Sequence, residues 1–394
     1  MIQLYDNKGI PKSLLLMMAV VGGLTVANLY YNQPLLEEIR ADLGVGEAAA
    51  NLITVITQVG YALGLLLIVP MADIWSRRKI VGVSMGITVL MATAIAVAPN
   101  VWTVWSASII LGACSVVPQV FVPMAGQYSR PEERSQNMGI VQSGVLTGVL
   151  GARVVSGYLG GWIGWRLMFG VVAVVMAVCL VVTLRSLPRI KPAFQTSYPH
   201  LLRTIATIFR EQPRVRIYSL RAAFSFGSMM TVWSCLAFHL AGAPFHASSD
   251  RVGMLGLCGL VGAMAASVVG KYIPRFGIQR LSVFGACLQV AAWLTAYFFG
   301  DTYAGLIATI MLVDAGAQCQ QLSNQSGCLA AVPGASNRTN TIFMVSLFIG
   351  GGLGTFAAGS AWTMLGWTGV CAVGMVFCLC SLMVSAYIGR KGAR

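Results

Sequence analysis

The sequence predicts an all-α membrane protein made of two similar bundles of six transmembrane helices. Of its 394 residues, 57% are hydrophobic and 10% are charged, whereas about a quarter of the residues of a soluble protein are charged. Apolar stretches recur along the whole chain, and three landmarks of the first half return about 200 residues later. A duplicated bundle in a membrane places its working site between the halves, near the bilayer midplane, so these observations favour a transporter.

The apolar stretches are long enough to cross a bilayer, which takes about 20 residues of helix. Backbone groups in lipid must be hydrogen-bonded within their own segment, so helices are expected here and an open sheet is not. We expect twelve helices, near residues 13–35, 48–72, 80–99, 101–127, 136–159, 166–186, 216–241, 252–272, 279–299, 303–327, 339–363 and 367–388.

The internal repeat is visible in the polar connections. The three pairs of landmarks are residues 69–79 with 270–280, Arg134-Ser-Gln-Asn137 with Arg338-Thr-Asn340, and Gly164-Trp165 with Gly366-Trp367. We therefore expect an N-terminal bundle over 1–186, a cytoplasmic linker over 187–215 and a C-terminal bundle over 216–394. In the linker, Leu201, Ile205 and Ile208 share one helical face, which predicts an amphipathic helix on the inner membrane surface. A solvated linker is the alternative.

The excess of basic residues follows the topology. Most of the 26 Lys and Arg fall in alternate loops that would lie on one side of the membrane, and the other side has only Arg40, Arg166 and Arg251. This positive-inside asymmetry predicts that both termini are cytoplasmic. It also explains the net charge of +14 without nucleic acid as a partner. The ten cysteines lie within apolar spans and show no metal-ligand spacing with histidine, so we expect no metal and no cofactor.

The loop that carries Asp73 and Arg77-Arg78-Lys79 resembles the loop between the second and third helices of the major facilitator superfamily. Further stretches are similar to bacterial drug-efflux and arabinose-efflux permeases of that superfamily: Ala27-Asn28-Leu-Tyr30-Tyr31-Asn32-Gln33-Pro34, Gly151-Ala-Arg153-Val-Val-Ser-Gly157, Gly164-Trp165-Arg166 and Asn340-Thr-Ile-Phe-Met. The resemblance implies the major facilitator fold in a bacterial inner membrane. Ser108 and Val145 stand where drug antiporters of the superfamily carry an arginine and a proline.

Asp314 is the strongest candidate for chemistry. It is the only acidic residue deep in an apolar span, where a carboxylate is costly unless it is paired, hydrated or protonated. At 100° per residue, three glutamines share its helix face: Gln318, Gln321 and Gln325. This polar stripe predicts either a wet substrate cavity with a proton-binding acid or a structural hydrogen-bond network.

Arg153, in the fifth span, is the expected countercharge of Asp314, and Gln142 lies on the same face of that span. A contact that changes as the halves move would couple proton binding to conformation. A simple bond from Arg153 to a backbone carbonyl is the alternative. In the first span, Thr25, Asn28, Tyr31 and Asn32 are expected to line the substrate cavity, although asparagines also join membrane helices.

Asp73, Arg77, Arg78 and Lys79 are interpreted as a gating loop, because their charges must bond at the inner surface in one conformation and release in another. The resemblance implies that Asp73 pairs with helix ends of the opposite half. A fixed cluster that only sets topology is the alternative.

These patterns predict a secondary active transporter that exports a small organic molecule in exchange for protons, by alternating access and as a monomer in the lipid bilayer. An uptake symporter or facilitator for a small polar solute is the second hypothesis. No catalytic constellation or phosphate-binding loop is visible, so an enzyme is not expected.

Overall fold

The computed structural model describes residues 4, 8–130, 133–188, 197–332 and 336–392; some side chains, including those of Asp73 and residues 260–272, lie outside the described part. Throughout these ranges the regular secondary structure is helical, without a strand. Eight of the described helical stretches are long and apolar enough to cross a membrane. The predicted all-α membrane class is therefore confirmed, while the number twelve stays a prediction.

The first part of the chain forms eight α-helices. They are α1 (Lys12–Val26), α2 (Leu36–Leu43), α3 (Glu47–Leu67), α4 (Met71–Ile74), α5 (Arg77–Ala96), α6 (Val101–Cys114), α7 (Val117–Tyr128) and α8 (Arg134–Ser186). Two short 3-10 helices, η1 (Ala27–Leu29) and η2 (Gln33–Leu35), separate α1 from α2. Pro34 and Pro118 lie just inside the starts of η2 and α7, where a proline costs no helical hydrogen bond.

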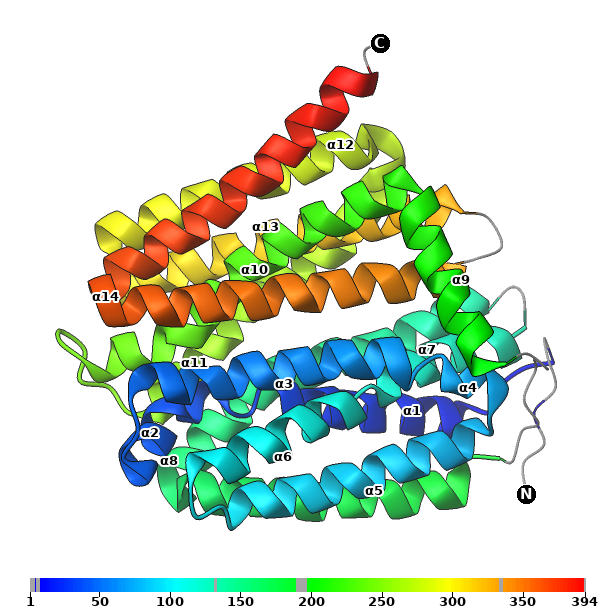
Figure 1. Ribbon diagram of the computed structural model, residues 1–394, viewed down its shortest axis with the longest axis horizontal. Helices are drawn as coiled ribbons and strands as arrows, with labels where there is room; N and C mark the ends of the chain where they lie inside the picture. The colour runs from blue at the N-terminus through cyan, green and yellow to red at the C-terminus, as the bar shows by residue number, and fades with distance from the viewer. Residues whose placement is uncertain (1–3, 5–7, 131–132, 189–196, 333–335, 393–394) are drawn as a thin grey trace.

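The second part consists of helix α9 (Tyr198–Glu211) and five further α-helices. These are α10 (Pro213–Ala241), α11 (Ser249–Leu255), α12 (Leu260–Phe299), α13 (Tyr303–Ala331) and α14 (Ser336–Gly392), with the 3-10 helix η3 (Gly256–Gly259) between α11 and α12. Figure 1 shows the helices before α9 and those after it as two bundles lying side by side, with α9 crossing one end of both.

Two repeated landmarks of the sequence are chain reversals. Gly164 in α8 and Gly366 in α14 have φ of +78° and +58°, and each interrupts a long helix. Glycine tolerates positive φ because it has no Cβ. In Figure 1 the two arms of α14 fold back on one another at this point. The Gly-Trp pairs of the repeat thus mark the turn between two antiparallel helices of each bundle.

The end of the molecule that carries α9 is called here the linker side, and the opposite end the far side. Helix α3 runs between them: the Tyr198 hydroxyl of α9 donates a 2.8 Å hydrogen bond to the Leu67 carbonyl at its last residue. The predicted amphipathic helix is present as α9, but Ile205 and Ile208 are buried against the protein. Phe209 stays 45% exposed. The apolar face of α9 therefore serves mainly to join the helix to the bundles.

The interior of the second bundle contains a polar network behind α13. The fully buried Arg221 of α10 donates to Asn324 Oδ1 from Nε and to Gln279 Oε1 from Nη1, both at 2.6 Å. Gln320 of α13 donates to Gln289 at 2.8 Å and accepts from Ser381 at 2.5 Å. Because these bonds join α10, α12, α13 and α14, the network ties the bundle together.

Candidate functional site

A cavity of about 110 Å³ lies between the two bundles. Its polar lining includes Gln142 and Arg153 from α8, Asp314, Gln318 and Gln321 from α13, and Gln119 from α7. The structure therefore brings together five of the residues that the sequence places in a coupling pair and a substrate cavity. Residues from both halves line this one cavity, because α8 and α13 both border it.

Asp314 lies in the wall of this cavity and is only 5% exposed. It is the only carboxylate among the buried side chains of the described residues. Its Oδ1 accepts a 3.1 Å hydrogen bond from the indole Nε1 of Trp233 in α10. A Cβ on Gly259 would come within 3.1 Å of the other carboxylate oxygen, Oδ2. Glycine in η3 thus leaves Oδ2 the room to border the cavity.

Arg153, 3% exposed, lies over the ring of the same Trp233. Its guanidinium carbon is 3.9 Å from the Trp233 ring centroid and 4.9 Å from that of Tyr30, and such cation–π contacts are worth about 2 kcal/mol when desolvated. Arg153 Nε donates a 2.8 Å hydrogen bond to Gln33 Oε1, and Nη2 has no partner among the described residues. The guanidinium is thus held by one amide and two rings.

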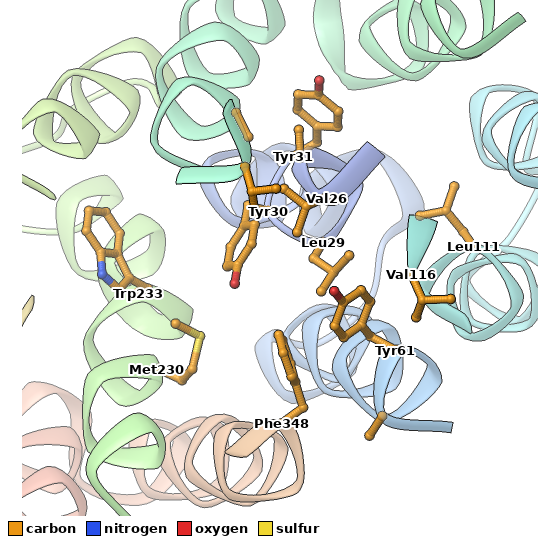
Figure 2. Packing of buried hydrophobic residues seen from close by; sticks show 14 of the residues in the cluster. Val26, Leu29, Tyr30, Tyr31, Tyr61, Leu111, Val116, Met230, Trp233 and Phe348 are labelled. Atoms are coloured by element: carbon orange, nitrogen blue, oxygen red, sulfur yellow. The ribbon is translucent and has the colours of Figure 1, made fainter. Parts of the chain in front are cut away.

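Aromatic rings form much of the remaining cavity wall. Tyr61 and Phe348 lie with centroids 4.4 Å apart, and Phe226 follows 5.4 Å from Phe348. Gln119 donates a 3.3 Å hydrogen bond to the Tyr61 hydroxyl. Figure 2 shows Tyr30 and Trp233 facing Tyr61 and Phe348 across the space between the bundles. The cavity therefore combines two charges, four amides and an aromatic wall.

The first-span residues expected in the cavity lie elsewhere. Thr25 bonds to the Val21 carbonyl, Asn28 to Ser115 and Asn32 to Thr57. Tyr31 points away from Tyr30 in Figure 2 and lines an outer groove between α1 and α8. Helix α1 ends at Val26 and continues as 3-10 helix, so a regular spacing of 100° per residue no longer assigns the faces.

Gln325, the last glutamine of the predicted stripe, also lies apart from the cavity lining. Its Nε2 donates a 2.9 Å hydrogen bond to Asn340 Oδ1 of α14. This contact joins α13 to α14 near the linker side, where Asn340 borders a separate groove. Of the three glutamines of the predicted stripe, Gln318 and Gln321 thus line the central cavity and Gln325 does not.

The predicted gating loop lies on the linker side. Arg77 donates to Gln127 Oε1 at 2.8 Å, and Arg78 donates to the carbonyl of Leu184. Lys79 is exposed, and the side chain of Asp73 lies outside the described residues. Two arginines of the loop therefore bond within the first bundle.

The interface between the bundles differs at its two ends. On the far side, Trp362 Nε1 donates to Glu47 Oε2 at 2.6 Å and Asn51 Nδ2 donates to the Ser234 carbonyl at 3.1 Å. On the linker side, a groove lies between the bundles and is lined by Arg77 and Arg338, among others. Gln119 and Met344 line both this groove and the central cavity. Toward the linker side, the cavity therefore borders a groove. On the far side, hydrogen bonds join the two bundles.

Several residues of the site were not found from the sequence. Gln33 bonds Arg153 across 120 positions, and Gln119 is carried by a separate short helix after the break at Ser115. Trp233 and Tyr30 were visible only as aromatic residues of apolar spans. Their signal is weak because aromatic side chains are common in membrane helices, and only the packing of the bundles selects those that face the cavity.

Comparisons with known proteins agree with this architecture. The sequence matches the Major Facilitator Superfamily over residues 18–355. The chain belongs to this superfamily. It is 34% identical to the uncharacterized transporter YgaY of Escherichia coli O157:H7 over 383 residues, which cover 96% of each chain. It is 23% identical to the inner membrane transport protein YnfM of Escherichia coli K12, over 98% of this chain and 93% of that protein.

Solved structures of the superfamily share the fold. A peptide transporter solved with alafosfalin superposes with a TM-score of 0.77 at 15% identity, over 98% of this chain and 97% of the other. The nucleoside transporter NupG superposes with a TM-score of 0.71 at 15% identity, over 95% and 98%. The protein is thus a multi-pass membrane transporter of the major facilitator superfamily, whose members bind small-molecule substrates within the membrane.

Proposed function

We propose that this transporter exports a small organic molecule from the cytoplasm in exchange for protons, by alternating access of the central cavity. The observation that carries the proposal is the position of Asp314, a buried carboxylate in a cavity between the bundles. A carboxylate at this depth is stabilised by pairing, by hydration or by protonation. Ligand binding and proton binding can therefore exclude one another at one group.

The surroundings of the cavity support the direction. The bias of Lys and Arg toward the loops of the linker side makes this side cytoplasmic, together with both termini, in a bacterial inner membrane. The groove between the bundles then lies at the cytoplasmic end, beneath α9, and the Glu47–Trp362 contact joins the bundles on the outer side. In this arrangement a monomer takes substrate from the cytoplasm, and a proton from outside reaches Asp314 after the bundles move.

Replacing Asp314 tests this proposal. In proteoliposomes with an imposed pH gradient, we expect Asp314→Asn to reduce proton-driven transport at least 100-fold, because the amide carries no titrating proton. Asp42→Asn is the matched control: Asp42 pairs with Arg166 at the surface, so its loss leaves transport within about twofold of the wild type, as expected of surface changes. Undiminished pH-driven transport by Asp314→Asn would exclude Asp314 from the coupling.

An uptake symporter or facilitator for a small polar solute is the second candidate. It is favoured by Ser108 and Val145, which replace antiporter residues of the resembling permeases, and by the glutamines in the cavity wall. Counterflow that needs no pH gradient supports facilitation. Release of protons into the bath when substrate is added outside the vesicle supports antiport instead.

The far-side contacts give a second test of alternating access. Trp362→Phe removes the hydrogen bond to Glu47 and keeps an aromatic ring in place. A hydrogen bond to a charged group is worth about 1.5–3 kcal/mol, so we expect a larger population that is open on the far side. Spin-label distances between α3 and α14 at that end would lengthen. Unchanged distances would show that this contact does not hold the closed end.

A further inference from the structure

The central cavity contains two buried charges of opposite sign that do not pair with each other. Arg153 and Asp314 both line it, yet neither takes part in an ion pair with the other. Instead each contacts Trp233, Arg153 through the face of the ring and Asp314 through the indole N–H. One indole therefore contacts both a cation and an anion in the wall of one cavity.

Each charge keeps a free binding atom. Arg153 Nη2 is buried without a hydrogen-bond partner among the described residues, and only Nε is engaged, by Gln33. On Asp314 the described hydrogen bond is to Oδ1, while Oδ2 lies beside Gly259 in the cavity wall. A donor and an acceptor, both on charged groups, thus lie at the wall of one cavity without a described hydrogen-bond partner.

We propose that the substrate is a zwitterion, a molecule that carries an ammonium group and a carboxylate on one apolar body. Its carboxylate accepts a hydrogen bond from Arg153 Nη2, and its ammonium group donates to Asp314 Oδ2. A ligand with only one charge leaves the other buried charge without a partner, which is unfavourable in an interior shielded from water. A zwitterion neutralises both at once.

The rest of the cavity fits an apolar body. Tyr61, Phe226 and Phe348 form a contiguous aromatic surface, and Met229 and Met344 add flexible side chains that adapt to shape. This inference rests on the proposed export function and deepens it. The ammonium group and a proton compete for the same carboxylate, so arrival of the proton on Asp314 releases the substrate.

Binding to the purified transporter in detergent at pH 7.5 tests the inference without any transport. The probes are leucine, methionine, phenylalanine and tryptophan, each compared with its decarboxylated amine and with its deaminated acid. Quenching of tryptophan fluorescence or calorimetry gives the affinities; calorimetry serves for the tryptophan series. We expect at least one zwitterion to bind tenfold or more tightly than both of its singly charged relatives.

Two variants of the wall reverse this preference in opposite directions. Arg153→Gln removes the partner of the carboxylate, so the amine binds as tightly as the zwitterion or better. Asp314→Asn removes the partner of the ammonium group, so the acid is favoured. Arg221→Gln is the matched control, because Arg221 is an equally buried arginine whose described partners are residues of the second bundle. It lowers stability and leaves the ligand order unchanged.

The inference is overturned if no zwitterion of the panel binds, if an amine or acid binds the wild type as tightly as its zwitterion, or if neither variant changes the order. Failure of the inference is distinguishable from failure of the export proposal. A zwitterion preference without pH-driven transport contradicts proton exchange alone, and pH-driven transport of a singly charged compound contradicts the zwitterion alone.

Discussion

The two faces of α13 carry the same kinds of side chain and put them to different uses. Toward the other bundle, Asp314, Gln318 and Gln321 border the central cavity. Toward the interior of its own bundle, Gln320 and Asn324 are hydrogen-bonded to Gln289, Ser381 and Arg221. Gln320 and Gln321 are neighbours in sequence, yet one is fully buried and bonded and the other lines a cavity. A polar side chain of α13 that has hydrogen-bond partners within its own bundle therefore stabilises the bundle, whereas one without such partners is left to line the cavity.

The two buried arginines differ in the number of their oxygen partners, although Nη2 of each has no hydrogen-bond partner among the described residues. Arg221 donates to oxygen atoms of three residues from α12, α13 and α14. Arg153 has one such oxygen, from Gln33, and is otherwise held between two aromatic rings at the cavity wall. Removing a bonded partner inside a bundle should cost stability, whereas changing a cavity side chain should alter binding. Neighbouring residues of α13 allow this to be tested in pairs.

The largest effect is expected at Asn324. Asn324→Leu removes the acceptor of the 2.6 Å bond from Arg221 Nε, and a hydrogen bond to a charged group is worth about 1.5–3 kcal/mol. Thermal unfolding in detergent should show a marked drop in the midpoint. Asn324→Asp, which keeps an acceptor at this place, should lose much less. Equal losses in the two variants would show that the bond to Arg221 is not what stabilises this position.

A smaller difference is expected between the neighbours Gln320 and Gln321. Gln320→Leu leaves Gln289 and Ser381 each without one of their partners, at a cost of about 1–3 kcal/mol. Gln321→Leu at the cavity wall should change the unfolding free energy by less than about 0.5 kcal/mol, but should alter substrate affinity. Unfolding and binding measured on both variants check this. If both lose stability alike, the two faces of α13 do not differ as described.

The smallest effect is expected at Gly259, which sharpens the description of the cavity face. In Gly259→Ala the added Cβ would lie 3.1 Å from Asp314 Oδ2 and 2.8 Å from Leu150 Cδ2. The leucine can move, so we expect little loss of stability and a several-fold weaker binding at Asp314. Gly139→Ala, whose Cβ would meet nothing within 4 Å, is the control. Unchanged ligand affinity in Gly259→Ala would argue that Oδ2 is not a binding atom.

Much of the architecture could be predicted from the chain, because a bilayer imposes helix length and apolar composition; the orientation in the membrane stays a prediction. The repeated Gly-Trp pairs could be recognised in the sequence because a chain reversal needs a residue that tolerates positive φ. Gly164 and Gly366 both adopt positive φ at such reversals. The helical stripe from Asp314 to Gln321 was also legible, because α13 is an uninterrupted helix from Tyr303–Ala331.

Periodicity stopped being informative where helices are broken. The faces of Asn28, Tyr31 and Asn32 could not be assigned because the first span changes from α to 3-10 helix at Ala27. Gln325 follows the stripe but lies where α14 approaches, so Asn340 engages it. The sequence determined the membrane class and singled out Asp314 as a buried acid, because these depend on composition and local order. Only the tertiary structure decided which polar groups find partners, because the packing of α10 against α13 brings Trp233 to Asp314, and Arg153 of α8 lies over the same indole at the cavity wall.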